Sequence, residues 1–493
     1  MKPRRRTVPA TLYAQLIDPV TLVTDSDGSI VASLQDHSVA LGKFSAGTGK
    51  RARDLREGFP LSALTSAAGS VGHEMRLLLR RLAGHGLLEY RLGRSRAGGD
   101  AIVIEPQVPD YWPGTARLLD ADVLVLSRFA YMRRRGTDLV LESPRAGALF
   151  KIGNPQIAAG LVTLSAPQKI GRLRRRPGFP GLDLLALLLD CQMLFKVDPT
   201  RANALREAEG DEHLVLWDFH DLLFHTRSTA GRHANPLGGL CPYGDIIAPL
   251  PAVRPPWPGR KINLRKVVTP DAQSTAFMAN LLRARHSTRS FEGRRPILLG
   301  ELAGFLDGAA RVHSRATMQL DLGGGGPLVA YAARPYPSAG AAYELELYLA
   351  VDKCEGLARG FYHYDAGAHA LLAIEVQSTD LEAMLQGAEF AMGASGLPQI
   401  LITIAARFGR VAWKYSSLAY ALILKDVGVL MQTLYLMAGE AGLGGCAIGS
   451  ADIALFAKMT GMEFHVEGPV GQFALGRVAN LQDGRNRRSD QSA

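Results

Sequence analysis

The sequence predicts an α+β protein in two parts that are divided by a Pro-rich linker. Residues 248–261 hold five prolines, which donate no backbone hydrogen bonds and favour an extended chain. Before this segment, a pattern of strands followed by a helix occurs twice. After it come alternating strand patterns and one long apolar helix pattern. We therefore predict two N-terminal modules (1–115 and 116–247), a linker (248–263) and a C-terminal domain (264–493).

Composition excludes some classes and leaves others open. The net charge of +10 and a pI near 9.5 predict a basic surface, which suits nucleic acid, anionic lipid, acidic peptide or a phosphorylated cofactor. The four cysteines contain no CxxC pair, so we expect reduced thiols and neither a disulfide framework nor a zinc site. The basic N-terminus lacks the apolar core of a signal peptide, and the longest apolar stretch, 418–424, is shorter than the roughly 20 residues of a membrane span. We expect a cytoplasmic protein without a membrane anchor.

The N-terminal half contains a diverged repeat. Strand patterns at 28–34 and 37–44 precede a helix pattern at 73–92, and strands at 138–143 and 146–152 precede a helix at 181–197. Aligning Leu82 with Leu189 and Leu87 with Leu194 gives the same offset of 107 residues. A helix, a turn and a short strand in this order indicate winged-helix-like modules. Such modules bind DNA through a helix or bind a peptide at a sheet edge.

The arginines of this half leave the ligand open. They suit phosphate or an acidic peptide, or form a solvated face; they are Arg80, Arg81, Arg133, Arg134, Arg135, Arg172, Arg174, Arg175 and Arg176.

A long helix is expected over 419–440 in the C-terminal half. Its polar residues recur at seven-residue steps, 425 to 432, 426 to 433 and 433 to 440, so they form one narrow stripe on an otherwise apolar helix. This pattern is typical of a buried core helix or of one shared between subunits. Gly442 and Gly444 are suited to its C-terminal cap.

Two motifs suggest a site for a phosphorylated, planar ligand. RARHSTRSF at 283–291 places Arg285, Ser287 and Arg289 at a helix-to-loop junction. Guanidinium and hydroxyl groups bind phosphate or an electron-rich ring edge; the alternative is an exposed basic loop. PYPSAG at 335–340 is a small-residue turn before an alternating strand, where a flat ring can approach the backbone; the alternative is an ordinary loop.

Two further motifs bear on catalysis. RFGRVAWKYSSLAY at 407–420 contains adjacent Lys414 and Tyr415. In a loop both side chains reach one ligand, and an ammonium beside a phenol favours the phenolate, which makes a general base; the alternative is a packed Tyr beside a solvated Lys. The glycines of AGLGGCAIGSAD, 441–452, allow close approach of a planar ligand. The glycines at 323–326 indicate a flexible loop, and His220, Asp221 and His225 lack further ligands for a metal.

The order of these motifs resembles the nitroreductase superfamily. RHSTRSF, YPSAGAAYELELYLAV, GFYHYD, RFGRVAWKYSSLAY and GLGGCAIG follow one another over about 280–478. The WKYS and PSAG versions look like the SagB-type dehydrogenase branch, which includes the azoline oxidases of thiazole- and oxazole-modified peptide pathways. Segments 125–150 and 216–234 look like the N-terminal extension of cyanobactin-type oxidases, where winged-helix-like modules resemble peptide clamps.

The resemblance implies a homodimer with non-covalent FMN at its interface. It assigns the phosphate and pyrimidine edge of the flavin to Arg285, His286, Ser287 and Arg289. It also assigns contacts to a partner-lent segment of Pro337, Ser338 and Gly340, and to a segment facing flavin N5 of Ile448, Gly449 and Ser450. Ser450 stands where a glycine is usual. Arg477 is expected to complete the phosphate site, with Arg485, Arg487 and Arg488 as competitors.

The resemblance assigns catalysis to Lys414 and Tyr415. The implied reaction removes a Cα proton and a hydride from a thiazoline or oxazoline of a peptide, with molecular oxygen as final acceptor and a cyclodehydratase as an expected partner. A second enzymatic interpretation is an NAD(P)H-dependent reductase of quinones or nitro compounds, or an oxidase of a carrier-bound or small heterocycle. The non-enzymatic alternative is a peptide- or DNA-binding scaffold, with DNA the less favoured ligand.

Overall fold

The computed structural model describes residues 10–34, 37–66, 70–93, 102–114, 116–198, 200, 212–234, 246, 277–319, 327–415 and 418–479. The chain forms two compact units, one of residues 1–227 and 231–235 and one of residues 228–230 and 236–493. The predicted linker at 248–263 and the glycine run at 323–326 lie outside the described residues.

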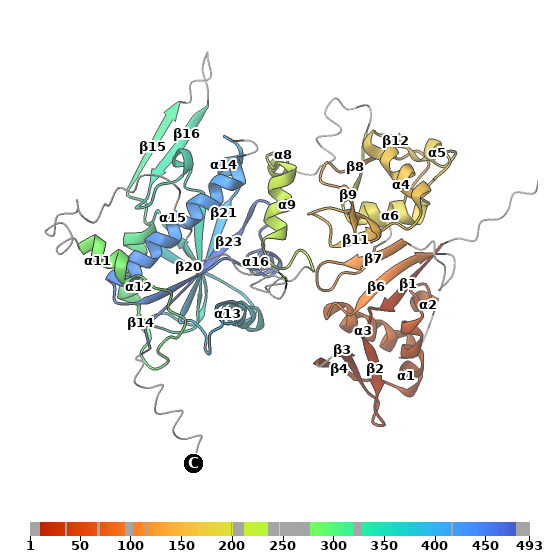
Figure 1. Cartoon of the computed structure of the whole chain (residues 1–493), viewed down its shortest axis with the longest axis horizontal. Coiled ribbons are helices and arrows are strands. Elements are labelled where there is room, and N and C mark those ends of the chain that lie inside the picture. The colour runs from red at the N-terminus through yellow and green to blue at the C-terminus, as the bar shows by residue number, and fades with distance from the viewer. Residues whose placement is uncertain are drawn as a thin grey trace, which may run out of the picture. The chain divides into compact units, whose positions relative to one another are not determined.

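The first unit contains the same order of elements twice (Figure 1). The first copy is β1 (Thr11–Leu16), β2 (Thr21–Thr24), β3 (Ser29–Leu34), β4 (His37–Lys43), α1 (Ala46–Ala52), η1 (Arg53–Arg56), β5 (Phe59–Pro60), α2 (Ala63–Ser66), α3 (Ser70–Gly84) and β6 (Leu88–Gly93). The second is β8 (Val123–Leu126), β9 (Tyr131–Arg135), β10 (Asp138–Glu142), β11 (Ala148–Lys151), α4 (Pro155–Val162), η2 (Thr163–Ser165), β12 (Gln168–Lys169), α5 (Ile170–Leu173), α6 (Leu182–Asp190) and β13 (Leu194–Lys196).

Strand pairing repeats as well. β1 lies between β5 and β6, as β8 lies between β12 and β13, and all four pairings are antiparallel. The internal repeat is therefore present in the fold, while the winged-helix interpretation of each copy stays a prediction.

One sheet runs through both copies. β7 (Ile102–Pro106) follows β6 and pairs with β11, which gives the strand order β5-β1-β6-β7-β11-β10-β9. Buried residues of both copies, among them Leu82, Tyr90 and Phe150, belong to one hydrophobic cluster. The two predicted modules thus share a core. They are joined by β7, which follows the first copy and pairs with β11 of the second. Two short helices, α8 (Glu212–Val215) and α9 (Phe219–Arg227), follow the second copy.

The second unit is built on a six-stranded antiparallel sheet. Its order is β20 (Ala370–Ile374), β19 (Gly360–Asp365), β17 (Leu345–Val351), β21 (Ile400–Arg407), β23 (Glu467–Gly476) and β22 (Gly444–Ile448). Every residue of β23 is buried, as expected for a strand covered on both faces. The predicted hairpin at 360–374 is confirmed as β19–β20.

Helices cover both faces of this sheet. α13 (Ser378–Met392) and α16 (Ile453–Thr460) join a buried cluster with Ala474 of β23. On the opposite face, Phe473 packs against Tyr435 of α15 (Ala419–Glu440), and α12 (Leu299–Ala310) also contacts α15. The other elements are α11 (Phe277–Ala284), β14 (Ile297–Leu298), β15 (Ser314–Gln319), β16 (Leu328–Ala333), η4 (Ala339–Ala341), β18 (Cys354–Glu355) and α14 (Gly409–Ala412).

The long helix α15 confirms the predicted element and corrects its expected polar stripe. Asp426, expected on that stripe beside Lys425, is buried, whereas Lys425 is exposed. By length and composition α15 is apolar enough to cross a membrane, but core helices of soluble proteins share these properties, and a third of its most apolar window is buried within this unit. Gly442, with φ +66°, provides the left-handed residue after the helix, while Gly444 belongs to β22 and contacts Thr288.

Candidate flavin site

Lys414 and Tyr415 meet at the turn that carries Gly340. Both follow α14 in an irregular segment, the setting in which both side chains can reach one ligand. A Cβ placed on Gly340 would lie 2.6 Å from the Tyr415 Oη atom and 2.8 Å from the Lys414 Nζ atom. Gly340 has φ +58°, a conformation that favours glycine. The polar ends of the two predicted catalytic residues therefore converge on the backbone of the PYPSAG turn.

Arg410 connects the two segments that form this convergence. Its guanidinium donates to the carbonyl oxygens of Ala342 (3.0 and 3.2 Å) and Ala330 (3.1 Å). Since Arg410 lies in α14, four residues before Lys414, these bonds fix the segment that carries Lys414 and Tyr415 against the turn. Arg410 belongs to the motif at 407–420, but the sequence alone indicated no role for it.

The carboxylates of Asp426 and Glu344 contact the PYPSAG turn. The Ser338 hydroxyl lies 3.0 Å from the Asp426 Oδ2 atom and 3.2 Å from the Glu344 Oε2 atom, and it accepts the Tyr343 backbone N–H at 2.9 Å. The Ala339 N–H donates to Asp426 at 2.8 Å. In this chain Ser338 is thus bonded to α15 and to its own turn.

Glu344 is fully buried and holds a proton near neutrality. Burial raises the pKa of its carboxyl to about 7, and the negative charge of Asp426 adds to the rise. A buried carboxyl group beside a second carboxylate is harder to ionise, because the like charge adds to the cost of desolvation. The sequence reasoning missed both residues; Asp426 sat in an expected polar stripe, and Glu344 in a strand that alternates with apolar residues.

A second cluster surrounds Tyr435. Its hydroxyl lies 2.7 Å from the Ser287 Oγ atom and accepts the Ala447 N–H at 2.8 Å. The Arg285 guanidinium carbon lies 5.1 Å from the centre of the Tyr435 ring. Arg285, His286 and Arg289 are exposed, while Thr288 between them is buried and donates its N–H to Gly445 at 2.8 Å. Tyr435, which sequence reasoning missed, thus joins the predicted 285–289 segment to the predicted end of β22.

The end of β22 offers open backbone. Ile448 is its last residue and is buried, Gly449 is exposed, and a Cβ on Gly449 would meet no atom within 4 Å. By contrast, a Cβ on Gly445 would lie 2.3 Å from the Phe473 ring. Gly445 is therefore required by packing, whereas Gly449 and the half-exposed Ser450 border free space, which suits approach of a flat ligand.

Arg477 is engaged elsewhere. Its guanidinium forms an ion pair with Glu301 at 2.5 Å and donates to the Pro296 carbonyl at 3.2 Å. These contacts tie β23 to the start of α12, so the structure gives no support to a phosphate contact from Arg477, which stays a prediction. The competing Arg485, Arg487 and Arg488 lie outside the described residues.

The turn cluster and the Tyr435 cluster lie along one helix. Asp426 and Tyr435 are nine residues apart on α15, which is about 14 Å along the axis at ~1.5 Å per residue. The structure therefore brings Lys414, Tyr415, Ser338 and Gly340 together, and separately Arg285, Ser287 and the end of β22. Arg285, Arg289 and the open Gly449 backbone fit the phosphate and flat ring of FMN, whose site the resemblance divides between two subunits.

A separate polar cavity of about 490 Å³ lies in the same unit. Its lining includes Arg315, Arg334, Glu346, His363 and Arg407. Within the described residues, no cluster of three or more His, Cys, Asp or Glu side chains is arranged to hold a metal.

Two separate segments of the chain match known protein families. Residues 282–477 match the Nitroreductase family, and residues 124–234 match the family described as "Cyanobactin oxidase ThcOx". Among curated relatives, a Methanocaldococcus jannaschii protein named as nitroreductase MJ1384 is 32% identical over 114 residues, 23% of this chain and 57% of that protein. The trifolitoxin-processing protein TfxB of Rhizobium leguminosarum bv. trifolii is 27% identical over 150 residues, 30% of this chain and 40% of TfxB. The chain thus spans about half the length of these relatives.

The E. coli microcin synthetase McbBCD complex with truncated pro-MccB17 contains a chain that is 20% identical, with a TM-score of 0.40, covering 55% of this chain and 97% of that one. A Bacteroides fragilis nitroreductase with bound FMN is 13% identical, with a TM-score of 0.25, covering 42% and 90%. By the family matches, residues 282–477 of this chain form a nitroreductase family domain, preceded at 124–234 by a segment of the cyanobactin oxidase ThcOx family.

Proposed function

We propose that this chain is an FMN-dependent oxidase that converts thiazoline or oxazoline rings of a peptide to the aromatic azoles. The observation that carries the proposal is the convergence of Lys414 Nζ and Tyr415 Oη on Gly340 in a nitroreductase family domain. The ThcOx segment of the same chain supports a peptide substrate. A flavin reductase of quinones or nitro compounds needs neither feature.

The chain's own residues supply proton transfer and positioning. Tyr415 takes the Cα proton of the ring as general base, and the adjacent Lys414 ammonium stabilises its phenolate form. Bound FMN supplies the acceptor for the hydride that leaves the same ring, so the substrate loses two protons and two electrons in total. Arg285, His286, Ser287 and Arg289 are the proposed groups for its phosphate and pyrimidine edge, and Ile448, Gly449 and Ser450 for its ring. Molecular oxygen is the proposed final electron acceptor.

The chemistry also implies partners and a compartment. An azoline is made by dehydrative cyclisation of a Cys, Ser or Thr side chain onto the backbone, so a cyclodehydratase must act first and is the proposed partner. We propose a homodimer because the turn cluster and the Tyr435 cluster are separated along α15. The described thiols, Cys191, Cys354 and Cys446, are free and buried, which is compatible with the proposed cytoplasmic location.

Substitution of the base tests the reaction directly. Tyr415→Phe keeps the ring but removes the ionisable oxygen, and Lys414→Ala removes the neighbouring charge. Azole formation from an azoline peptide, followed as a loss of two hydrogens per ring by mass spectrometry, should fall by about 10²- to 10⁴-fold in Tyr415→Phe. FMN released on denaturation should stay equal to that of the parent.

Tyr362→Phe is the matched control, since Tyr362 lies on β19 and bonds only the Ala358 carbonyl, at 2.9 Å, among the described contacts. Azole formation by Tyr415→Phe at the parental rate would show that another group is the base. A parent protein that ignores azolines but consumes NADPH with quinones would be a reductase instead.

A further inference from the structure

Strand β9 is the free edge of the seven-stranded sheet. It is the terminal strand, and among the described residues only β10 pairs with it. The outer N–H and C=O groups of an edge strand can pair with an added extended peptide. β9 therefore offers a backbone template in the first unit.

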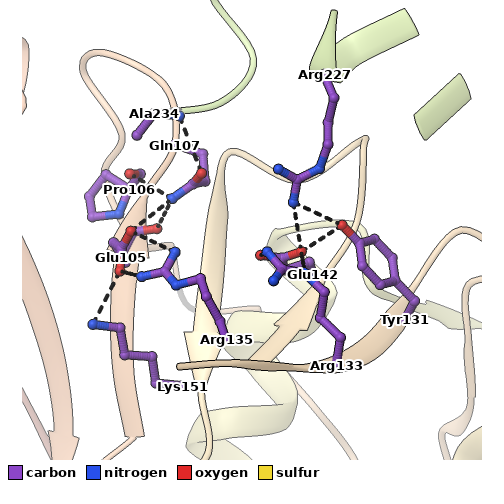
Figure 2. Close-up of polar contacts among 10 residues, drawn as sticks. All are labelled: Glu105, Pro106, Gln107, Tyr131, Arg133, Arg135, Glu142, Lys151, Arg227 and Ala234. Atoms are coloured by element: carbon purple, nitrogen blue, oxygen red, sulfur yellow. Dashed lines mark hydrogen bonds and ion pairs between the residues drawn. The ribbon is translucent and has the colours of Figure 1, made fainter. Parts of the chain in front are cut away.

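The face of β9 carries a surplus of positive charge. Tyr131, Arg133 and Arg135 occupy alternate positions and so lie on one face of the strand. Glu142 is held by two arginines, with Arg133 Nη2 at 2.9 Å and Arg227 Nη2 at 3.1 Å. Figure 2 shows these contacts together with those of Glu105, which is held by Arg135 and by Lys151 Nζ at 3.2 Å. Each carboxylate thus meets two cations, which leaves one unbalanced positive charge beside Arg133 and one beside Arg135.

A hollow lies over these charges. Its volume is about 450 Å³, and Tyr131, Arg133, Arg135, Leu223 and Arg227 line it; we name it the β9 groove. The side chains of Arg133, Arg135 and Arg227 are about one-third exposed. A ligand can therefore reach the guanidinium groups without displacing a packed side chain.

The spacing of the charges selects the ligand. Arg133 and Arg135 are two residues apart, which is about 6.8 Å in an extended strand. Side chains at positions i and i+2 of an added strand have the same spacing and face the same side, where opposite charges on adjacent strands attract. Carboxylates at alternate positions of a peptide thus match both surplus charges at once.

We infer that the β9 groove binds an extended acidic peptide segment with carboxylates at alternate positions, which pairs with the edge of β9. The inference rests on the proposed function, since an oxidase of peptide rings must hold a peptide. A duplex nucleic acid fits less well, because the groove combines a sheet edge and ion-paired, partly buried arginines with an apolar side chain, Leu223. The arginines of α3 are also engaged within the unit: Arg80 stacks on Trp112 at 4.1 Å, and Arg81 bonds the Leu41 carbonyl.

Fluorescence anisotropy with the full-length chain tests the groove. The probe is a fluorescein-labelled peptide of alternating Glu and Thr, and its isomer repeats Glu-Glu-Thr-Thr, which has the same composition and no Glu pair at i and i+2. The alternating probe should bind more tightly than its isomer. Two further probes carry N-methyl groups either on all Thr amides or on all Glu amides. In a paired strand only one of these two sets of amides faces β9. The probe that is methylated on that set should bind more weakly than the other.

Substitutions on one strand provide the matched comparison. Arg135→Gln leaves Glu105 paired with Lys151, and Arg133→Gln leaves Glu142 paired with Arg227. Each should weaken binding of the alternating probe by about two- to fivefold, as for a cross-strand charge pair. Arg134→Gln lies on the opposite face of β9 and should change the affinity by less than either. Circular dichroism melting shows whether each variant is folded. If Arg133→Gln is unfolded, the affinity of Arg135→Gln for the alternating probe tests the groove on its own.

Several outcomes would overturn the inference. They are equal binding of the two isomers, an Arg134→Gln effect as large as that of Arg135→Gln, or preferential binding of duplex DNA that Arg135→Gln abolishes. Azole formation is measured separately with azoline substrates. An active oxidase whose groove ignores the probe refutes only the groove, and an inactive chain whose groove binds the probe refutes only the oxidase.

Discussion

At the scale of single residues, the candidate site depends on groups that bond one another as well as on those that face a ligand. Ser338 and Gly340 were predicted as flavin contacts, and the structure adds Asp426, Glu344 and Arg410 as the groups that hold their turn. Positioned groups of this kind matter because proton transfer requires the base within hydrogen-bond reach of its proton. The turn is therefore fixed by Arg410 of α14, by Asp426 of α15 and by Glu344, which directly precedes β17.

Glu344 gives this turn a pH dependence. Its pKa in the folded chain is raised from 4.5 to about 7, so between these values the folded state binds more protons than the unfolded state. Stability is then greatest at the acid end of this range and falls as pH rises toward 7, by at most about 1.4 kcal/mol per pH unit. Glu344→Gln keeps the shape and removes the titration, so its free energy of unfolding should fall less steeply with pH than that of the parent.

Denaturant unfolding at several pH values between 4.5 and 7 measures this difference. Glu375→Gln, which removes an exposed carboxylate on the loop before α13, is the control and should retain the parental slope. Identical slopes in Glu344→Gln and the parent would mean that Glu344 is already ionised in the folded chain.

At the scale of elements, sequence patterns predicted those segments whose pattern is local. The helix at 419–440, the hairpin at 360–374 and the turn before β17 follow from periodicity and turn residues. The burial of Asp426 did not follow, because a seven-residue step places it on a stripe but does not reveal that the PYPSAG turn covers Asp426. The pairing of β7 with β11 was equally invisible, since it joins strands more than 40 residues apart.

The candidate site shows the same limit. The sequence left open whether Lys414 and Tyr415 lie in a helix or a loop, and the structure places them after the end of α14. Tyr435 was missed although it contacts Ser287, since a Tyr within an apolar helix pattern normally indicates packing. Only the fold brings positions 148 residues apart together.

The bond between the turn and α15 leads to a prediction for Ser338→Ala. The change removes the hydroxyl that contacts both carboxylates and the acceptor for the Tyr343 N–H. Leaving such groups without a partner costs about 1–3 kcal/mol, so we expect lower stability and faster hydrogen exchange in peptides covering 336–344. Mass spectrometry of exchange resolves this segment from the rest of the sheet. Ser378→Ala, at the exposed first turn of α13, should leave it unchanged, and an effect spread evenly over the unit would contradict a local anchor.

At the scale of the whole molecule, the fold places two kinds of surface on one chain. The first unit ends its seven-stranded sheet in the free edge of β9, and the second leaves apolar side chains along α15 partly exposed. The first surface suits a peptide, as argued for the β9 groove. The second suits another copy of the chain, because a long apolar helix whose outer side is only partly covered within its own unit gains by burial against a partner.

A matched pair of glycines tests whether α15 lies in a homodimer interface. Gly428 on α15 and Gly387 on α13 are both exposed, both within helices, and a Cβ at either would meet no atom within 4 Å. Gly→Arg is therefore compatible with the fold of the single chain at both positions, and Arg has the higher helix propensity.

We expect the parent to have about 106 kDa by light scattering, twice the 53.0 kDa of the chain. Gly387→Arg should retain this mass. Gly428→Arg should give the monomer, because a buried unpaired charge at an interface costs several kcal/mol, and it should lose FMN if the flavin site is shared between subunits. A monomeric parent that retains FMN would contradict the shared site, and a dimeric Gly428→Arg would place the interface elsewhere.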